Sequence, residues 1–416
     1  MDRTTRAQRA DTLRAQYDAF KARKLSLDMT RGKPCGEQLD LSLGLLDCLG
    51  REYRAADGTD CRNYGVVEGL PEARALFAEL LEVEPAEVIV GGNSSLAMMH
   101  DTVVQGLLKG WPDAPPWRER GAVKFLCPSP GYDRHFFICE RYGIEMIPVP
   151  MGEDGPDMDR VEELASSDPQ VKGIWCVPRY SNPTGVTYSD DTVARLAHMQ
   201  AAPDFRILWD NAYAVHHLVD QPKPLANILR ACRAAGHPDR PIVFTSTSKI
   251  SFAGAGVGVL AASPTIVRHL LGALSIQTIG HDKLNQLRHV RFFKNAAGIA
   301  AHMRKHAAIL KPKFDAVASV FDGALRGKQI AEWSRPEGGY FISFDTLDGC
   351  ASKVVALADA AGVKLTKAGS TFPYGRDPRD RNIRLAPSLP DGDEIRQAME
   401  LVAVAVELAS LEKAGC

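Results

Sequence analysis

A single lysine between a hydroxyl-rich run and a glycine-rich run constrains this chain more than any other feature. Residues 245–258 read Thr-Ser-Thr-Ser-Lys-Ile-Ser-Phe-Ala-Gly-Ala-Gly-Val-Gly, with the lysine at position 249. Apolar runs on both sides, at 241–246 and 257–262, predict two buried strands. A lysine on a short turn between core strands is partly desolvated, which lowers its pKa and suits it to act as a nucleophile or to form a Schiff base. The stretch therefore predicts a reactive amine at the edge of a sheet.

The hydroxyl groups beside Lys249 suit a phosphate. A lysine next to a phosphate site fits pyridoxal 5′-phosphate (PLP), a cofactor that proteins hold as a lysine Schiff base. A phosphate-binding loop of another kind, or a merely flexible Ser/Gly turn, fits this stretch alone as well. The rest of the chain has to separate these interpretations.

Composition narrows the class of protein. The chain has 416 residues, more than one hydrophobic core usually holds, so we expect two domains. A formal net charge of −1 argues against nucleic acid or an anionic membrane as the main partner. The nine cysteines are scattered and form no Cys-x-x-Cys pair, which fits a reducing cytoplasm better than a disulfide framework or a zinc site. We find no secretory signal and no run long enough to cross a bilayer.

The order of apolar runs predicts the architecture. An amphipathic helix is expected at 6–24, and from residue 86 short apolar runs alternate with helical stretches, which predicts an α/β domain with a mostly parallel sheet. We expect the loop at 111–121 to be a surface insertion. A second, smaller α/β unit follows, with strands at 338–344 and 382–387 and a closing helix at about 391–412. The strands expected in the larger sheet lie near 87–91, 122–127, 144–149, 172–178, 205–210, 241–246 and 257–262.

Polar side chains follow most of these strands at the point where each one ends. Because ligands of open α/β sheets bind beyond the carboxyl ends of the strands, we expect these groups to lie together. The Gly-Ser turn at 91–95 also opens a helix whose amides can seat a phosphate. The convergent groups are Ser94, Ser95, Tyr132, Asn182, Asp210, Tyr213, Ser246, Ser248 and Lys249.

This ordered set resembles PLP-dependent aminotransferases of fold type I over nearly the whole chain. The matching residues are the Asn-Pro-Thr-Gly run at 182–185, Asp210 with Tyr213, the Ser-x-x-Lys run at 246–249, the Gly-Gly-Tyr-Phe run at 338–341, and Arg384. Finer runs at 127–136, 180–185, 253–256 and 280–291 are similar to a bacterial aspartate aminotransferase subgroup related to the aminotransferase domain of MocR-type regulators.

The resemblance implies a domain organisation and two central roles. A large PLP-binding domain would span 36–305, and a small domain would combine 306–416 with the N-terminal segment 1–35. Lys249 would form the Schiff base and then act as general base and acid at the substrate Cα. Asp210 would pair with the pyridine nitrogen and make the ring an electron sink. The plainer interpretation of Asp210 is a helix N-cap.

Further contacts follow from the same resemblance. Asn182 and Tyr213 would hydrogen-bond the phenolic oxygen of PLP, and Tyr132 would stack on its ring. Arg384 would pair with the substrate α-carboxylate, a natural bidentate partner for a guanidinium, although an ordinary salt bridge is the alternative. Gly32 would lie over the substrate. The phosphate would be held by Ser94, Ser95, Ser246 and Ser248, with Tyr64 reaching it from a neighbouring subunit in a homodimer with shared sites.

Two places in the sequence leave questions open. Many members of the family carry an arginine that pairs with the phosphate where this chain has Gly256. A dicarboxylic substrate also needs a second cation, for which Lys283, Arg288, Arg291 and Arg179 are candidates beside a plain charged helix face.

His302 and His306 have the i,i+4 spacing of metal ligands, but no nearby carboxylate completes a set. We therefore expect a solvated or packed helix face there, and no metal.

The predicted function is an aminotransferase that works by a two-step exchange. An L-amino acid would leave its amino group on PLP, and a 2-oxo acid would then take it up. Aspartate with 2-oxoglutarate is the pair that the resemblance favours. The alternatives are another PLP reaction on the same scaffold, such as a β-lyase or decarboxylase, and a PLP-binding sensor module without turnover.

Overall fold

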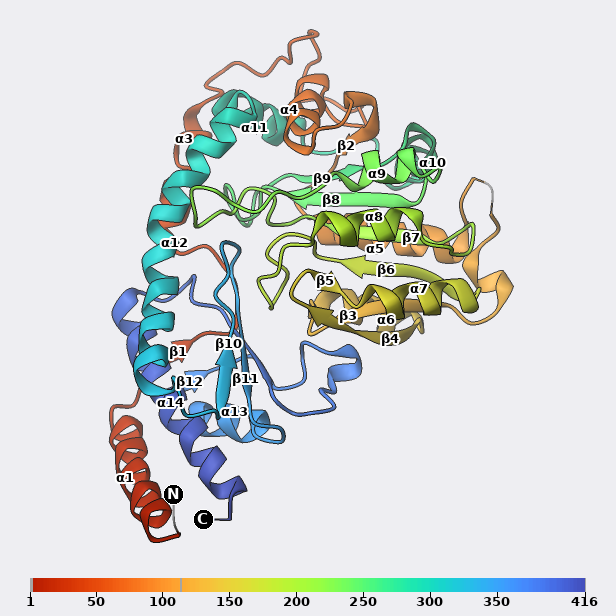
Figure 1. The fold of residues 1–416 in the computed structure, drawn as a ribbon. Coiled ribbons are helices and arrows are strands. Elements are labelled where there is room, and N and C mark those ends of the chain that lie inside the picture. Colours follow the sequence, from red (N-terminus) through yellow and green to blue (C-terminus); the bar gives the residue numbers. More distant parts are fainter. Residues whose placement is uncertain (1–2, 113, 416) are drawn as a thin grey trace.

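An eight-stranded sheet forms the larger unit of the molecule, seen as a computed structural model that describes residues 3–112 and 114–415 (Figure 1). Its strand order is β2-β9-β8-β7-β6-β3-β4-β5. The strands from β8 to β4 are parallel; β9 is antiparallel to both neighbours, so β2 runs in the direction of β8. The bounds are β2 (Val88–Val90), β3 (Lys124–Ser129), β4 (Glu145–Gly152), β5 (Gly155–Pro156), β6 (Val171–Cys176), β7 (Arg206–Asp210), β8 (Pro241–Ser246) and β9 (Gly258–Ala261).

All seven strands predicted for this sheet are present. The eighth, β5, is two residues long and pairs back onto β4 after a turn, too short to leave an apolar run in the sequence.

Helices cover both faces of this sheet because its central strands are apolar on both sides. Successive residues of a strand point to opposite faces, so Phe125 and Trp175 pack into one core while Leu126 and Ile174 pack into the other. The first core also takes residues of α5 (Ser95–Leu108), α6 (Asp133–Tyr142) and α10 (Pro264–Gln277). The second takes residues of α4 (Pro71–Leu81), α7 (Met158–Ser167), α8 (Asp190–His198) and α9 (Ile228–Ala234).

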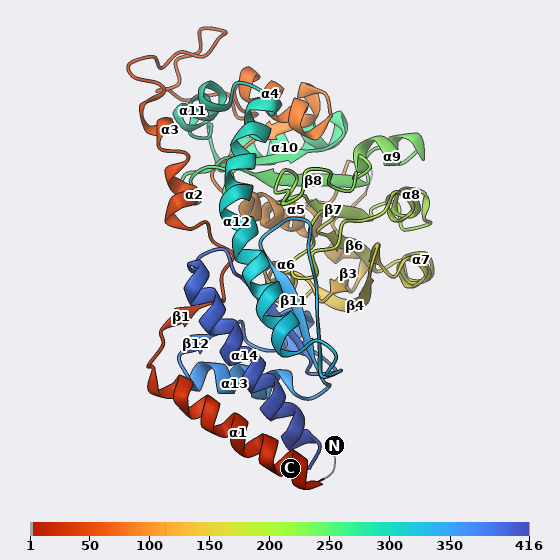
Figure 2. The ribbon, with the colours of Figure 1, turned by 60° about the vertical axis from the view of Figure 1, so that its left-hand side comes forward.

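A smaller unit packs around two short sheets. One sheet has the order β10-β11-β13, and the other pairs β1 with β12, so residues near the start of the chain lie beside residues near its end. Figure 2 shows α1 lying along α14. The bounds are α1 (Arg3–Ala22), β1 (Leu27–Asp28), β10 (Ala331–Trp333), β11 (Ile342–Thr346), α13 (Ala351–Ala360), β12 (Val363–Lys364), β13 (Asn382–Leu385) and α14 (Gly392–Lys413).

The long helix α12 (Ala296–Ala324) connects the two units (Figures 1 and 2). Its first half packs near α4 and α11, and its second half packs on α14. Domain boundaries at residues 35 and 305 stay a prediction. The remaining elements are α2 (Gly36–Asp40), α3 (Gly44–Asp47), α11 (Lys283–Phe293) and the 3₁₀ turns η1 (Pro85–Glu87), η2 (Trp117–Arg120) and η3 (Pro373–Gly375).

The loop at 111–121 lies at the surface as expected, since most of its described residues are partly or fully exposed, but two tryptophans anchor it to the core. Trp111 and Trp117 are both buried, and their rings lie 5.8 Å apart. Trp117 packs closely over Gly106 of α5, where an added Cβ would come within 2.6 Å of its ring. The two tryptophans thus belong to the core that α5 covers. Within the described part of the chain, no helix is both long and apolar enough to span a membrane.

Candidate active site

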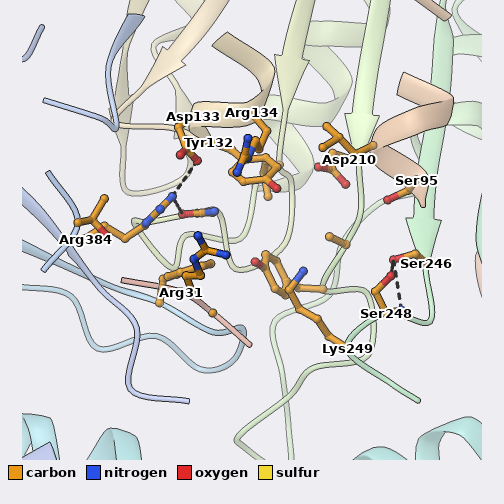
Figure 3. Close-up of a pocket in the computed structure, with 18 of the residues that line it drawn as sticks. Arg31, Ser95, Tyr132, Asp133, Arg134, Asp210, Ser246, Ser248, Lys249 and Arg384 are labelled. Atoms are coloured by element: carbon orange, nitrogen blue, oxygen red, sulfur yellow. Dashed lines mark hydrogen bonds and ion pairs between the residues drawn. The ribbon is translucent and has the colours of Figure 1, made fainter. Parts of the chain in front are cut away.

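A pocket of about 550 Å³ lies where the carboxyl ends of the large sheet meet the small unit (Figure 3). Tyr132 follows β3, Asp210 ends β7 and Ser246 ends β8, so the parallel strands bring these side chains to one edge. Eleven of the residues predicted from the sequence line this pocket: Gly32, Ser94, Ser95, Tyr132, Asn182, Asp210, Tyr213, Ser246, Ser248, Lys249 and Arg384. Their individual roles stay predictions.

Tyr64, the residue predicted to reach the phosphate of a neighbouring subunit, does not line the pocket. Its side chain is 80% exposed, in the loop before α4. Because its predicted contact is with a neighbouring subunit, that role stays a prediction.

Lys249 sits on the turn that follows β8, with its amine in the pocket. Nζ lies 5.1 Å from the centroid of the Tyr213 ring, and it makes no hydrogen bond or ion pair within the described chain. Burial lowers the pKa of the Lys249 ammonium, and the negative charge of Asp210 opposes that effect only in part. A desolvated amine of this kind has a larger fraction in the neutral, nucleophilic form.

Asp210 is buried (3% exposed), and only one of its two carboxylate oxygens is paired. Oδ2 lies 3.0 Å from Nε2 of His135, whose ring stacks on Trp175 with centroids 4.2 Å apart. Oδ1 has no hydrogen-bond partner among the described residues. A turn rather than a helix follows Asp210, so this oxygen caps no helix. Because an unpaired buried carboxylate oxygen is costly, the site favours a ligand that brings an N–H donor.

A second group of polar atoms suits an anion. Ser94 caps the N-terminus of α5, where its side chain accepts a hydrogen bond from Ala97 N. Ser246 Oγ and Ser248 Oγ lie 3.2 Å apart across the turn (Figure 3). The free amides and positive dipole end of a helix N-terminus, together with hydroxyl donors, stabilise negative charge.

Gly256 is packed against the main chain of this turn. A Cβ at this position would lie 3.0 Å from Ser248 N and 3.1 Å from Thr247 Oγ1. A larger residue at position 256 would therefore require the main chain of the lysine turn to shift by a few tenths of an ångström. Among the described residues on this side, hydroxyl groups and the N-terminus of α5 are the donors available to an anion.

Arg384, on β13, approaches the pocket from the small unit and is buried (8% exposed). Nη1 lies 3.1 Å from Asp133 Oδ1 and 3.5 Å from Asn182 Oδ1. The guanidinium carbon sits 5.0 Å from the centroid of the Phe341 ring. Gly32 covers the same ring so closely that an added Cβ would be 2.5 Å from Phe341 Cζ. Only glycine fits at position 32 while that ring stays in place.

Three more cations line the pocket, and sequence reasoning missed their place in it. We call Arg31, Arg134 and Lys367 the cationic rim; all three are exposed and make no ion pair within the described chain. With Lys249 and Arg384, five cations face two carboxylates there, those of Asp133 and Asp210. Arg31 precedes Gly32 and Arg134 follows Tyr132-Asp133, so proximity to predicted site residues was a usable signal for these two. No such signal pointed to Lys367.

The four cations proposed from the sequence as readers of a second carboxylate do not line this pocket. Lys283 Nζ donates to the Gly65 carbonyl over 2.9 Å. Arg291 donates to two main-chain carbonyls of the 52–54 segment, and Arg179 donates to the carbonyl of Lys223. Arg288 lies on α11 with Lys283 and Arg291. Within one chain, the three cations of the rim line the pocket and these four do not.

Two tyrosines of the site are held in the protonated form. Burial raises the pKa of Tyr132 and of Tyr213, and the negative charge of Asp210 adds to the effect on both. Each phenol is therefore a hydrogen-bond donor at neutral pH.

His302 and His306 are packed rather than solvated. Both are buried, and their Nε2 atoms lie 3.1 Å apart. They contact Ser42, Gln38 and the Ile250 carbonyl, and no metal-binding cluster of His, Cys, Asp or Glu occurs among the described residues.

Comparisons with known proteins agree with this geometry. The family model described as aspartate amino-transferase matches residues 1–415. An aspartate aminotransferase of Corynebacterium glutamicum is 49% identical over 405 residues, 97% of this chain and 94% of that protein. The crystal structure of an aspartate transaminase from that species has a TM-score of 0.96 at 48% identity, covering 99% of this chain and 98% of that one. At 22% identity, an α-aminoadipate aminotransferase of Thermus thermophilus shares the fold, with a TM-score of 0.77 and coverage of 95% of each chain.

Proposed function

This chain belongs to the aspartate amino-transferase family, and from that membership we propose that it moves the amino group of L-aspartate to 2-oxoglutarate with PLP as its cofactor. The observation that carries the proposal is the convergence of the Lys249 amine, the unpaired Oδ1 of Asp210 and the Arg384 guanidinium on one pocket.

The residues of the pocket fit PLP. Asp210 Oδ1 lacks the donor that a protonated pyridine nitrogen would supply. Ser246, Ser248 and the N-terminus of α5 offer hydroxyl and amide donors to a phosphate. Lys249 has an unpaired amine in the same pocket.

The chain's own groups divide the chemistry between them. When bound, PLP supplies an electron-withdrawing ring that stabilises negative charge at the substrate Cα. Lys249 would hold the cofactor through its amine and, once displaced by the substrate, would take a proton from Cα and return one as general base and acid. Asp210 would keep the ring nitrogen protonated. Asn182 and Tyr213 would hydrogen-bond the phenolic oxygen, and Tyr132 would cover the ring.

The charge of the pocket supports an acidic substrate. Arg384 would read the α-carboxylate as a charge-assisted pair, joining Asn182 in one hydrogen-bonded group. The cationic rim leaves positive charge unpaired at the pocket mouth, where the second carboxylate of aspartate or 2-oxoglutarate would enter. Aspartate is also the substrate named for the Corynebacterium relatives.

A homodimer with shared sites is part of the same proposal. Large apolar side chains are exposed near the Tyr64 loop, and Gly65 N donates to the Ile279 carbonyl, which joins that loop to the segment after α10. A second copy of the chain packing on this face would cover these side chains and bring Tyr64 towards the partner's phosphate site. The exposed residues are Leu43, Leu46, Tyr64, Ile276 and Ile279. The free cysteines of the described chain fit a cytoplasmic setting.

The deciding experiment is the visible absorption spectrum of the purified, PLP-loaded protein. L-aspartate alone should remove the band of lysine-bound PLP, and 2-oxoglutarate should restore it. Lys249→Ala, as the control, should lack that band. A band that ignores aspartate but responds to another amino acid would discard the substrate and keep the enzyme class. A protein that takes up no PLP would overturn the proposal.

A further inference from the structure

The turn that carries Lys249 contains buried carbonyl groups that the backbone leaves unpaired. Within the described chain, no backbone amide donates to the carbonyls of Lys249 and Ile250, although Ile250 N and Ser251 N both donate to the Thr247 carbonyl. Buried main-chain carbonyls need a donor, because an unpaired one forfeits the hydrogen bonds that water would supply. A side chain must therefore provide these hydrogen bonds.

His216 supplies the donor for Lys249 itself. Its Nε2 lies 3.2 Å from the Lys249 carbonyl oxygen, and its side chain is buried. The ring is held edge-on against two tyrosines, Tyr213 at 5.6 Å and Tyr340 at 5.7 Å between centroids. Both tyrosines are buried, so the imidazole packs against core side chains on these two sides.

His302 of α12 holds the next residue. Its Nε2 lies 2.9 Å from the Ile250 carbonyl oxygen. Behind it, His306 lies 3.1 Å away and is 3.0 Å from Nε2 of Gln38, which also donates to Tyr340 Oη over 2.8 Å. Gln38 Nε2 is a donor, so His306 Nδ1 accepts and its proton is on Nε2, facing His302. The Ile250 carbonyl is therefore held by the His302–His306 pair as a unit, which connects it to α2 and to the small unit.

His289 of α11 holds the third residue. Its Nδ1 lies 2.8 Å from the carbonyl of Asn285, which places a proton on that nitrogen. Its Nε2 is then an acceptor, 2.8 Å from Ser251 Oγ and 3.1 Å from Thr247 Oγ1. Three histidines from three separate segments thus contact residues 249, 250 and 251 in sequence.

We propose that His216, His302 and His289 are positioning residues that fix the main chain of the lysine turn, so that the Lys249 amine is held at one place in the pocket. None of them touches the pocket, and their effect passes through the turn. A displacement of about 1 Å at a reacting group can cost about 10²-fold in rate. Loss of His216 or His302 would release a carbonyl of this turn, and loss of His289 would release the hydroxyls of Ser251 and Thr247. Either change would make the position of the amine less well defined.

The histidines can act in this way because they are neutral. Burial lowers the pKa of all three imidazoles, to about 4 for His289, and Lys249 adds its own charge to the effect on His216. A neutral imidazole donates through one nitrogen only, so each ring has a defined donor and acceptor side.

Matched variants separate the hydrogen bond from the space that the ring fills. His216→Leu removes the donor to the Lys249 carbonyl, and His302→Leu removes the ring nitrogen that faces the Ile250 carbonyl. His216→Gln and His302→Gln keep an amide group near the position of Nε2. His269→Leu is the control, because His269 makes the same kind of bond far from the site, with Nε2 3.0 Å from the Gly110 carbonyl.

The experiment has two readouts. The first is kcat and KM of amino transfer in the PLP-loaded enzyme. The second is the rate at which an amine-selective acylating reagent labels Lys249 in the cofactor-free protein, followed by peptide mass spectrometry. His216→Leu should lower kcat by about 10²-fold and His302→Leu by about tenfold, with KM changed less than about threefold. Both Leu variants should change the rate at which Lys249 is labelled. The Gln variants should return kcat and the labelling rate most of the way to the wild-type values.

Two results would overturn the proposal. One is a wild-type kcat and labelling rate in both Leu variants; the other is a Gln variant no better than its Leu counterpart. If the Leu variants do not fold, His216→Gln is compared with His216→Asn, whose amide lies near the position of Nδ1 instead of Nε2. Equal kcat and equal labelling rates in these two variants would overturn the proposal. The labelling rate tests the turn even if the protein transfers no amino group, so this failure and failure of the proposed function are distinguishable.

Discussion

The sheet side of the pocket and its cationic rim are built in opposite ways. Asp210 and Ser246 end buried strands, and Lys249 lies on the turn that follows one of them, where His216 contacts its carbonyl. Arg31 and Lys367 lie in loops outside helices and strands, and like Arg134 they are exposed and without an ion-pair partner in the described chain.

The two sides differ in whether their charged groups need a partner from the folded chain. The groups on the sheet side are costly to bury, so the fold must place and pair them, and the single orphaned oxygen of Asp210 stands out. The rim cations are hydrated without a ligand, so nothing in the fold has to pair them. Variants on the sheet side should therefore affect the rate of the chemistry, and variants on the rim should affect which substrate binds.

The largest effect is expected from Asp210→Asn. The amide keeps the size of the side chain and can still bond His135, but it cannot stabilise a positive charge on the ring nitrogen. We expect the half-reaction with aspartate to slow by about 10²–10³-fold, measured by stopped-flow absorbance. A loss of rate smaller than about tenfold would mean that Asp210 is only a structural group. The sheet side would then not differ from the rim in its effect on the rate.

Arg384→Gln should have an intermediate effect. Losing a charge-assisted pair should lower kcat/KM by about 10–100-fold, and by the same factor for aspartate and for alanine, because both carry an α-carboxylate. Steady-state kinetics with the two amino acids measure this. A loss of kcat/KM confined to aspartate would mean that Arg384 binds the second carboxylate. Arg384 would then belong with the cationic rim.

The smallest effects are expected on the rim. Arg31→Gln, Arg134→Gln and Lys367→Gln are compared by the ratio of kcat/KM for aspartate to that for alanine. We expect Arg31→Gln to lower this ratio most, by about tenfold, because Gly32 and Arg384 share the Phe341 ring beside it. If no variant changes the ratio, the reader of the second carboxylate comes from a neighbouring subunit.

The α/β fold of type I aminotransferases was predictable because its signals are local. The strands around Phe125, Ile174 and Ile207 are short apolar runs buried on both faces, and the ends of each lie within two residues of the predicted ends. Family and enzyme class, predicted from the ordered motifs, are confirmed by the whole-chain match.

The cationic rim and the three histidines were harder to predict from the sequence, because their positions depend on contacts between distant segments. Arg31 reaches the pocket through the pairing of Leu27 with Val363, which no local pattern reveals. The spacing of His302 and His306 was visible, but their partners, Gln38 and the Ile250 carbonyl, lie on other segments.

Helix α12 gives the molecule a mechanical property. It spans 29 residues, about 43 Å at 1.5 Å per residue. His302 near one end braces the Ile250 carbonyl, while the opposite half packs on α14 of the small unit. Pro312 lies between these two contacts and has no N–H to donate, so the ladder of helical hydrogen bonds is interrupted there. Interior prolines are where helices kink, so α12 has a natural point of bending between the lysine turn and the small unit.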